Sequence, residues 1–231
     1  MMPKRVSQTA NEGFSLVELA VALVIIGLLV GGVLKGLDLI ESARLKSVLS
    51  QINEYRVAVS AFLDRYDALP GDYSDASTYI HKDLKNGDNS GIIEGEGLAA
   101  DSQALAFWSH LAAADFISKP GEQSQRQNGH FGKGAPQAKI GGGITVKHNP
   151  YPDMPGHWFI LGEENGTTNT NSGLTPLQAM TLDKKADNGD PLSGKIRAKD
   201  GADVPPGSCV TRDGKYNTQT SRKACVIYFK F

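Results

Sequence analysis

Histidine and cysteine are the side chains of this 231-residue chain best suited to catalysis or metal binding, and their spacing matches no enzyme motif. The histidines form no H-E-x-x-H or other zinc pattern, and the chain has no G-x-S-x-G elbow, no P-loop and no G-x-G-x-x-G after a strand. The five histidines are His81, His110, His130, His148 and His157. We therefore expect no enzyme, although scattered carboxylates leave a hydrolase open as an alternative.

One stretch has the residue types of a calcium loop. Residues 86–97 place oxygen-bearing side chains at positions one, three and five, glycine at six and an apolar residue at eight. Calcium takes six to eight oxygen ligands, and alternate residues around a tight turn bring several to one centre. Gly97 stands where the pattern needs a bidentate glutamate, so a nearby glutamate would have to replace it. The alternative is a solvated Asn/Asp/Gly turn. The predicted ligands are Asn86, Asp88, Ser90, Ile92, Glu94 and Glu96.

The overall charge argues against one class of partner. The chain has 24 basic and 25 acidic side chains, for a net charge of −1. A nucleic-acid binder normally shows a basic excess gathered on one face. We therefore expect no nucleic acid as a partner.

The elements that would position any site begin with an apolar segment. Residues 1–13 are polar and contain Lys4 and Arg5, whereas residues 14–34 contain a single charged residue, Glu18. A helix over 14–34 spans roughly 31 Å, close to the hydrocarbon thickness of a bilayer. The positive-inside bias keeps the basic start in the cytoplasm and places the rest of the chain across the membrane.

Two ordinary membrane segments are alternatives to consider here. A secretory signal peptide ends in a small-residue cleavage site, but this apolar run continues through Lys35 into a further helical pattern. The order of the segments therefore argues against a signal peptide. A plain uncleaved anchor is the second alternative.

Residues 13–18, Gly-Phe-Ser-Leu-Val-Glu, resemble the processing motif of type IV prepilins and type II secretion pseudopilins. In that family a membrane-embedded prepilin peptidase cuts between the glycine and the phenylalanine and methylates the new amino group. The resemblance implies that Gly13 ends the leader, that Phe14 becomes the methylated N-terminus and that Glu18 guides assembly. Many pilins carry a proline further along this helix, and residues 34–36 of this chain contain none.

The position of Glu18 also has a physical consequence of its own. A carboxylate inside a bilayer costs roughly 2.5–3.5 kcal/mol on insertion scales, and it is normally kept where a partner offsets that cost. We expect the partner to be the α-amino group of Phe14 on a neighbouring subunit, an arrangement that favours polymerisation. The alternative is a glutamate close enough to the interface to stay hydrated.

A long amphipathic helix continues from the apolar segment. Apolar residues recur at three- and four-residue spacing as far as Tyr66, and residues 69–71, Leu-Pro-Gly, form a stop signal. One half of this helix is therefore membrane stalk, and the other half is the spine of a head domain. The apolar stripe comprises Leu45, Val48, Leu49, Ile52, Tyr55, Val59, Phe62, Leu63 and Tyr66.

The rest of the chain has the pattern of a mixed head. Asp101 is the expected cap of a helix over 102–116, and Thr175, Pro176 and Gln178 form a capping box that opens a helix to about residue 184. A short antiparallel sheet should pack against the long helix. The expected strands are 138–147, 157–161 and 224–230, and the expected exposed loops are 119–136 and 163–174.

Cys209 and Cys225 lack the C-x-x-C spacing of a zinc site or a thioredoxin-type pair. A disulfide is the natural state if the head lies outside the cytoplasm, and their spacing resembles the C-terminal disulfide of pilins. Two separate buried thiols are the alternative.

Together these features predict an α+β, pilin-like fold with a long N-terminal helix on a small antiparallel sheet. The expected parts are a leader (1–13), a transmembrane and assembly helix (14–35) and a periplasmic head (36–231). The expected function is structural: a pilin or pseudopilin of a type IV pilus or type II secretion filament, held in the inner membrane before it enters the filament. The alternative function is a membrane-anchored periplasmic binding module.

The resemblance also implies partners. They are a prepilin peptidase, an inner-membrane assembly platform, identical or related pilin subunits and the lipid bilayer. No cofactor is required, and Ca²⁺ in the head is the one candidate.

Overall fold

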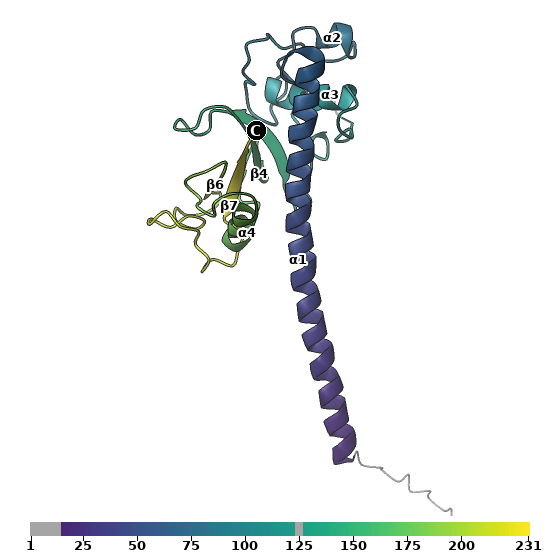
Figure 1. Ribbon diagram of the computed structural model, residues 1–231, viewed down its shortest axis with the longest axis vertical. Helices are drawn as coiled ribbons and strands as arrows, with labels where there is room; N and C mark the ends of the chain where they lie inside the picture. The colour runs from purple at the N-terminus through teal and green to yellow at the C-terminus, as the bar shows by residue number, and fades with distance from the viewer. Residues whose placement is uncertain (1–14, 123–126) are drawn as a thin grey trace, which may run out of the picture. The chain divides into compact units, whose positions relative to one another are not determined.

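The computed structural model describes residues 15–122 and 127–231, which form four helices and seven strands in an α+β order (Figure 1). The chain divides into two compact units, Met1–Ala43 and Arg44–Phe231, and α1 contributes to both. The helices are α1 (Leu16–Tyr66), α2 (Ala76–Tyr79), α3 (Gln103–Ala113) and α4 (Pro176–Ala186). The strands are β1 (His130–Phe131), β2 (Gly134–Ala135), β3 (Gly143–His148), β4 (His157–Asn165), β5 (Thr168–Asn171), β6 (Ile196–Asp200) and β7 (Cys225–Lys230).

Helix α1 has 51 residues and ends at Tyr66, as predicted. It ends there because Asp67 takes a positive φ of 50°, and Pro70 follows within the next turn. The predicted apolar stripe is confirmed apart from Leu63, which is 42% exposed. In the second unit the buried residues of α1 are Leu45, Val48, Gln51, Ile52, Tyr55, Ala58, Val59 and Phe62.

A small antiparallel sheet packs against this second part of α1. Strands β3, β4, β7 and β6 are hydrogen-bonded in that order, every neighbouring pair is antiparallel, and β5 pairs with β4. Because side chains alternate along a strand, one face of the sheet enters the core that α1 and α3 cover. This arrangement confirms the predicted α+β, pilin-like fold. The sheet contributes Ile144, Val146, Phe159, Leu161, Ile196, Ala198, Ile227 and Phe229 to that core.

Aromatic rings join α1, α3 and the sheet at the centre of the head. The ring of Tyr55 lies 5.0 Å from that of Trp108 and 6.0 Å from that of Phe159. Such pairs contribute about 0.5–1.5 kcal/mol beyond the area that they bury. Gln51 is buried beside them, and its Nε2 donates to the Tyr55 hydroxyl and to the carbonyl of Gln137, each at 2.9 Å. Gln51 and Tyr55 are therefore hydrogen-bonded within the protein, whereas the buried Trp108 Nε1 has no hydrogen-bond partner among the described residues.

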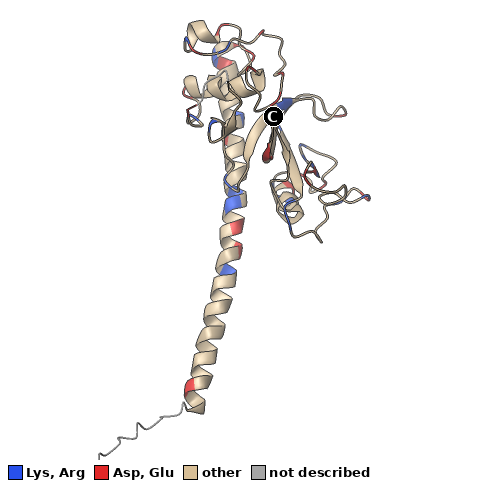
Figure 2. Cartoon of the chain, turned by 180° about the vertical axis from the view of Figure 1, so that it is seen from behind, with Lys and Arg blue, Asp and Glu red and all other residues tan. Residues whose placement is uncertain are grey.

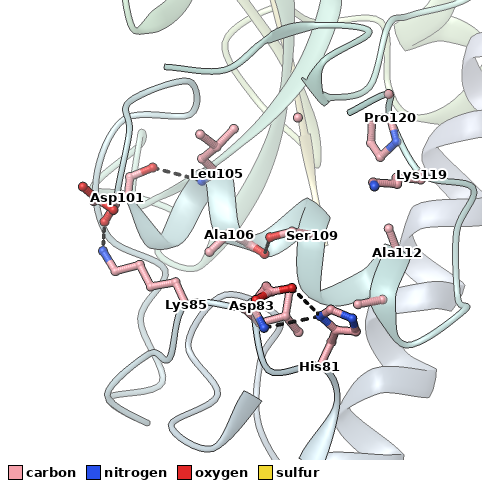
Figure 3. Close-up of a pocket in the computed structure, with 15 residues that line it drawn as sticks. His81, Asp83, Lys85, Asp101, Leu105, Ala106, Ser109, Ala112, Lys119 and Pro120 are labelled. Atoms are coloured by element: carbon pink, nitrogen blue, oxygen red, sulfur yellow. Dashed lines mark hydrogen bonds and ion pairs between the residues drawn. The ribbon is translucent and has the colours of Figure 1, made fainter. Parts of the chain in front are cut away.

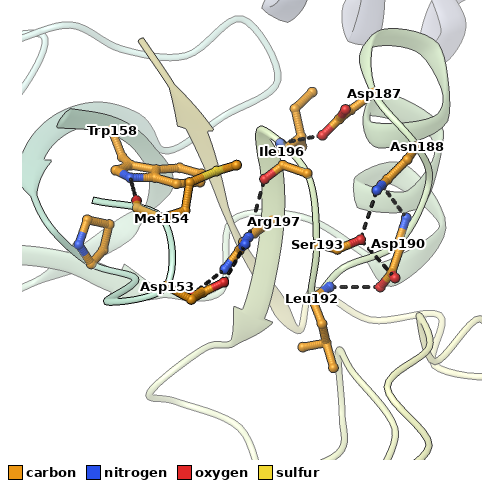
Figure 4. Close-up of polar contacts among 12 residues, drawn as sticks. Asp153, Met154, Trp158, Asp187, Asn188, Asp190, Leu192, Ser193, Ile196 and Arg197 are labelled. Atoms are coloured by element: carbon orange, nitrogen blue, oxygen red, sulfur yellow. Dashed lines mark hydrogen bonds and ion pairs between the residues drawn. The ribbon is translucent and has the colours of Figure 1, made fainter. Parts of the chain in front are cut away.

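The other face of the sheet has a smaller aromatic cluster that contains a buried cation. Trp158 and Tyr228 lie on the strands, and Tyr151 comes from the loop between β3 and β4. Arg197 is only 5% exposed, and it donates two hydrogen bonds to the Asp153 carboxylate, at 2.9 and 2.7 Å (Figure 4). This bidentate pair fastens the β3–β4 loop to β6 and compensates the buried charge.

The predicted cap of α3 is wrong by one residue. The N-cap is Ser102, whose hydroxyl accepts a hydrogen bond from the Leu105 N–H at 3.0 Å. Asp101 has a left-handed φ of 56° and precedes the cap. The helix also ends before the predicted residue 116, because it stops at Ala113 and Asp115 turns the chain with a φ of 62°.

The capping box predicted for α4 is confirmed. The Thr175 hydroxyl accepts from the Gln178 N–H at 3.2 Å, and the Gln178 side chain accepts from the Thr175 N–H at 2.9 Å. Pro176 occupies the first turn, where its missing N–H costs no helical bond. The helix extends to Ala186, two residues beyond the predicted end.

The predicted strands are found with different lengths. β3 begins at Gly143 rather than at residue 138, because Gly141 and Gly142 have φ values of 107° and 65°, which belong to a turn. β4 extends to Asn165, and β7 covers nearly the whole predicted range. β1, β2 and β5 lie in ranges predicted as loops, and β6 was not predicted.

The predicted disulfide between Cys209 and Cys225 is confirmed. The two Cα atoms lie 5.0 Å apart, and the sequence separation is 16 residues. A loop of this size is stabilised by roughly 3 kcal/mol in the chain-entropy model. The bond ties the segment after β6 to the start of the central strand β7.

Candidate processing and assembly site

Helix α1 begins with a reciprocal capping box made by Ser15 and Glu18. The Ser15 N–H donates to Glu18 Oε2 at 2.9 Å, and the Glu18 N–H donates to Ser15 Oγ at 3.2 Å. The S-x-x-E spacing produces this box, because residues three apart face each other across the first turn. The carboxylate also lies at the positive end of the helix dipole. Glu18 therefore has a partner in its own chain, which the sequence analysis did not predict.

The predicted processing residues, Gly13 and Phe14, and the predicted leader lie outside the described residues, which begin at Ser15. The cleavage position and the pairing of Glu18 with the α-amino group of a neighbouring Phe14 therefore stay predictions.

Beyond the capping box α1 is apolar and unburied. By length and composition it can cross a membrane, and none of residues 16–34 is buried. Most charged residues of α1 lie outside this stretch (Figure 2). Leu16, Leu23 and Leu28 expose 87%, 70% and 73% of their surface. A continuous apolar surface of this kind needs lipid or other helices to cover it.

The segment predicted to bind calcium folds around Asp72, a residue outside the predicted set. Asp72 is buried; its Oδ2 accepts from the Gly91 N–H at 2.8 Å, and its Oδ1 accepts from the Ser90 N–H at 3.2 Å. Gly87 passes so close that a Cβ there would lie 2.2 Å from the Asp72 backbone. The segment is therefore a turn closed on a buried carboxylate.

Asp88 shares this carboxylate environment. Burial raises the pKa of Asp72, and so does the neighbouring Asp88. The hydrogen bond between the two side chains lowers the pKa of Asp88 to about 2, helped by the Gln103 amide, which donates to Asp88 at 2.8 Å. Asp88 is thus the carboxyl that ionises first, and Asp72 retains its proton to higher pH.

Of the remaining predicted calcium ligands, Ser90 lies at this carboxyl pair, because its hydroxyl donates to Asp72 Oδ1 at 3.4 Å, whereas Asn86 and Glu96 bond to other residues. Asn86 Oδ1 accepts from the Ser77 N–H at 2.8 Å, and Glu96 accepts from the Thr167 hydroxyl. The Ile92 carbonyl accepts from the Ser90 hydroxyl. Within 15–122 and 127–231 no three His, Cys, Asp or Glu residues form a group that could hold a metal ion. Calcium binding, including the role of Glu94, stays a prediction.

A thermal melt tests that prediction. Millimolar calcium should raise the melting temperature of the full-length protein in detergent by about 2–4 °C relative to chelator, the shift expected for roughly 1 kcal/mol of ligand stabilisation. Asp88→Asn should abolish the shift because it removes an anionic ligand. Asp115→Asn, a change at an exposed turn outside the segment, serves as the matched control. Equal melting temperatures with calcium and with chelator would count against a site.

A cavity of about 840 Å³ beside α3 has walls of mixed polar and apolar residues, and the described residues that line it form no catalytic pair (Figure 3). His81 Nδ1 lies 3.7 Å from Asp83 Oδ2, and both side chains are exposed. Ser109 on the cavity wall donates its hydroxyl to the Ala106 carbonyl at 2.9 Å. A catalytic serine instead needs a base within hydrogen-bond reach.

The buried histidine of the head has a structural role. His110 Nδ1 accepts from the Gly71 N–H at 2.9 Å, and its Nε2 lies 2.7 Å from the Lys85 carbonyl, so the neutral ring donates there. Burial lowers the pKa of His110 to about 4. The ring bridges two loops as a neutral group.

Comparison with known proteins places a family motif at the N-terminus. Residues 9–34 match the model of the prokaryotic N-terminal methylation motif. No curated protein and no solved structure matches the chain. The match covers the predicted cleavage pair, the capping box and the whole apolar segment of residues 14–34, and it confirms the resemblance noted in the sequence.

Proposed function

We propose that this chain is a structural subunit of a type IV pilus or type II secretion filament. The premise is that it carries the prepilin-type methylation motif of type IV pilins and pseudopilins and is a pilin-like precursor. The observation that supports this most is the order of the parts. The motif at residues 9–34 overlaps the first part of α1, and the rest of the chain forms a head with its own core and disulfide.

The exposed apolar surface of α1 supports polymerisation through this helix. A single subunit can keep that surface in the bilayer, and a filament can cover it with the helices of neighbouring subunits. Both states remove the surface from water, so a subunit can pass from one to the other without exposing it. Glu18 is the exception, because its charge is costly in lipid and is offset by a neighbour that offers a cation.

The proposed partners follow from this passage of the subunit from the bilayer into the filament. A prepilin peptidase would cut after Gly13 and methylate Phe14, an inner-membrane assembly platform would insert the subunit, and identical or related subunits would bind its helix. The head would lie in the periplasm before it enters the filament. As a filament subunit the chain would be a structural protein, and this role requires no enzyme activity.

The mass of the N-terminus tests the proposal. The protein should be purified from membranes of cells with and without the prepilin peptidase and analysed by intact mass and N-terminal peptide mapping. We expect a chain that begins at methylated Phe14 when the peptidase is present and a chain with residues 1–13 when it is absent.

Retention of residues 1–13 in both strains would contradict the proposal. The chain would then fit a membrane-anchored binding module, in which α1 is only a tether.

A further inference from the structure

The turn between β4 and β5 carries a modification motif that the filament function does not use. Asn165, Gly166 and Thr167 have the N-x-[ST] pattern of an N-glycosylation acceptor, in which x is not proline. Asn165 is the only asparagine of the chain that is followed by serine or threonine two residues later. Glu163 lies two residues before it, the position at which bacterial N-glycosylation enzymes require an acidic residue.

The hairpin presents this motif at the surface of the head. Asn165 and Thr168 pair across β4 and β5, so Gly166 and Thr167 form the two-residue turn between them. Asn165 and Gly166 are exposed, and a Cβ added to Gly166 would meet no atom within 4 Å. A glycan is bulky and needs a surface position. The folded head therefore has room for one at this turn.

The contacts of the Asn165 side chain are compatible with an attached sugar. Its Nδ2 donates to Thr170 Oγ1 at 2.8 Å, and this bond uses one of the two N–H groups of the amide. Attachment of a sugar replaces one hydrogen of Nδ2 and leaves the other. The bond to Thr170 can therefore persist in the modified chain and hold the amide in its present orientation.

We propose that Asn165 is an N-glycosylation site, and that the donor is an oligosaccharide linked to a lipid diphosphate. A C–N bond forms between Asn165 Nδ2 and the anomeric carbon of the first sugar, and the bond from that carbon to the diphosphate oxygen breaks. Nδ2 loses one proton, and the lipid diphosphate leaves with the electron pair of the broken bond. This inference rests on the proposed function, which places the head on the side of the membrane where such a donor is used.

The contacts of Thr167 indicate when the transfer takes place. Its hydroxyl donates to the Glu96 carboxylate, and its carbonyl accepts from the Leu98 N–H at 2.8 Å. A transferase that binds the threonine hydroxyl of the motif must compete with Glu96. The transfer therefore precedes the docking of residues 96–98 on the hairpin, while the head is still folding.

Peptide mass spectrometry of the full-length protein from membranes of its native cells tests this site. Asn165→Gln removes the acceptor, Thr167→Ala removes the motif without changing the asparagine, and Thr167→Ser keeps the motif. Asn188→Gln is the matched control. Asn188 is also an exposed asparagine followed by glycine, but Asp190 stands where the motif needs serine or threonine.

We expect the wild-type peptide that contains Asn165 to carry the mass of at least one sugar, and fragmentation to place that mass on Asn165. Asn165→Gln and Thr167→Ala should each lose the added mass completely. Thr167→Ser and Asn188→Gln should retain it. Loss in Thr167→Ala identifies the motif, since Asn165 itself is unchanged in that variant.

Two results would overturn the inference. The first is an unmodified Asn165 in a wild-type chain whose leader has been removed, and it would leave the filament function standing. The second is a sugar attached to Thr168 or Thr170, which would make the modification O-linked. Removal of residues 1–13 is read from the same sample, so a chain that keeps its leader contradicts the proposed function separately from the result at Asn165.

Discussion

Replacing Glu18 by alanine should lower filament yield at least tenfold while leaving leader removal intact. Insertion scales put the cost of a carboxylate in the bilayer at roughly 2.5–3.5 kcal/mol. In the proposed filament, pairing with the amino group of a neighbour would recover that cost only after assembly, so the carboxylate would drive assembly. Alanine removes both the cost and the pairing, and the filament loses that driving force.

The size of this effect depends on how much of the cost of the Glu18 carboxylate is already offset by bonds within its own chain. The full insertion cost corresponds to about a hundredfold change in an equilibrium, since 1.4 kcal/mol is tenfold. The capping box with Ser15 supplies part of the compensation before assembly, because Glu18 Oε2 already accepts a hydrogen bond at 2.9 Å. We therefore expect a loss between tenfold and a hundredfold. Sheared filaments quantified against total subunit give the measurement.

Glu18→Gln is the matched variant for this experiment. Glutamine keeps the length of the side chain and can still accept from the Ser15 N–H, but it carries no charge. If the charge drives assembly, Glu18→Gln should fail nearly as strongly as Glu18→Ala. Wild-type filament yield in both variants would make the glutamate a hydrated residue near the interface and would rule out the pairing.

The long helix was predictable because its signals repeat over many residues. The apolar stretch and the stripe to Tyr66 cover 51 helical residues, and each residue adds to the same periodic signal. Strand β6 is the opposite case. Ile196 and Ala198 face the core while Arg197 and Lys199 alternate with them, so three of the five residues are charged and the strand resembles a loop in sequence. This segment forms a strand because it pairs with β7, which is distant from β6 in the sequence.

The first turn of α1 contained a signal that was missed. Ser15 and Glu18 have the S-x-x-E spacing of a capping box, but the sequence analysis assigned them to a processing motif and gave Glu18 a partner on a neighbouring subunit. The role of Asp72 could not be predicted from such a spacing. No local sequence pattern shows which carboxylate accepts the hydrogen bonds of a glycine-rich turn. The cap of α3 was misplaced for a related reason, since Asp101 and Ser102 are both good caps and only the left-handed φ of Asp101 separates them.

Acidification should destabilise the head between pH 6.5 and pH 4 because of its buried histidine. Burial lowers the pKa of His110 from 6.5 to about 4. Below pH 6.5 the unfolded chain takes up a proton that the folded chain does not, so the free energy of unfolding falls with pH until the folded pKa is reached. At about 1.4 kcal/mol per pKa unit, His110 alone should account for a loss of about 3 kcal/mol by pH 4.

Other titrating groups change the total but not the sign of this contribution. His157 also has a pKa lowered to about 4, by burial and by the neighbouring His148, and its partial exposure makes its contribution smaller. Asp72 and Asp183 have pKa values raised by burial, so the folded state takes up their protons first and gains stability as pH falls. The effect of His110 must therefore be measured as a difference between variants.

The free energy of unfolding is measured by urea unfolding of the full-length protein in detergent at pH 7 and pH 4. The fluorescence of the buried Trp108 and Trp158 reports the unfolding. His110→Gln keeps an acceptor and a donor but cannot take up a proton. Its free energy of unfolding should be lower than that of the wild type at pH 7, through poorer packing, but should fall about 3 kcal/mol less on going to pH 4. His81→Gln, at an exposed side chain, should follow the wild type at both pH values. The same pH dependence in His110→Gln and in the wild type would mean that the Gly71 loop moves to accommodate the charged ring, whose Nδ1 can no longer accept, and that acid acts elsewhere in the head.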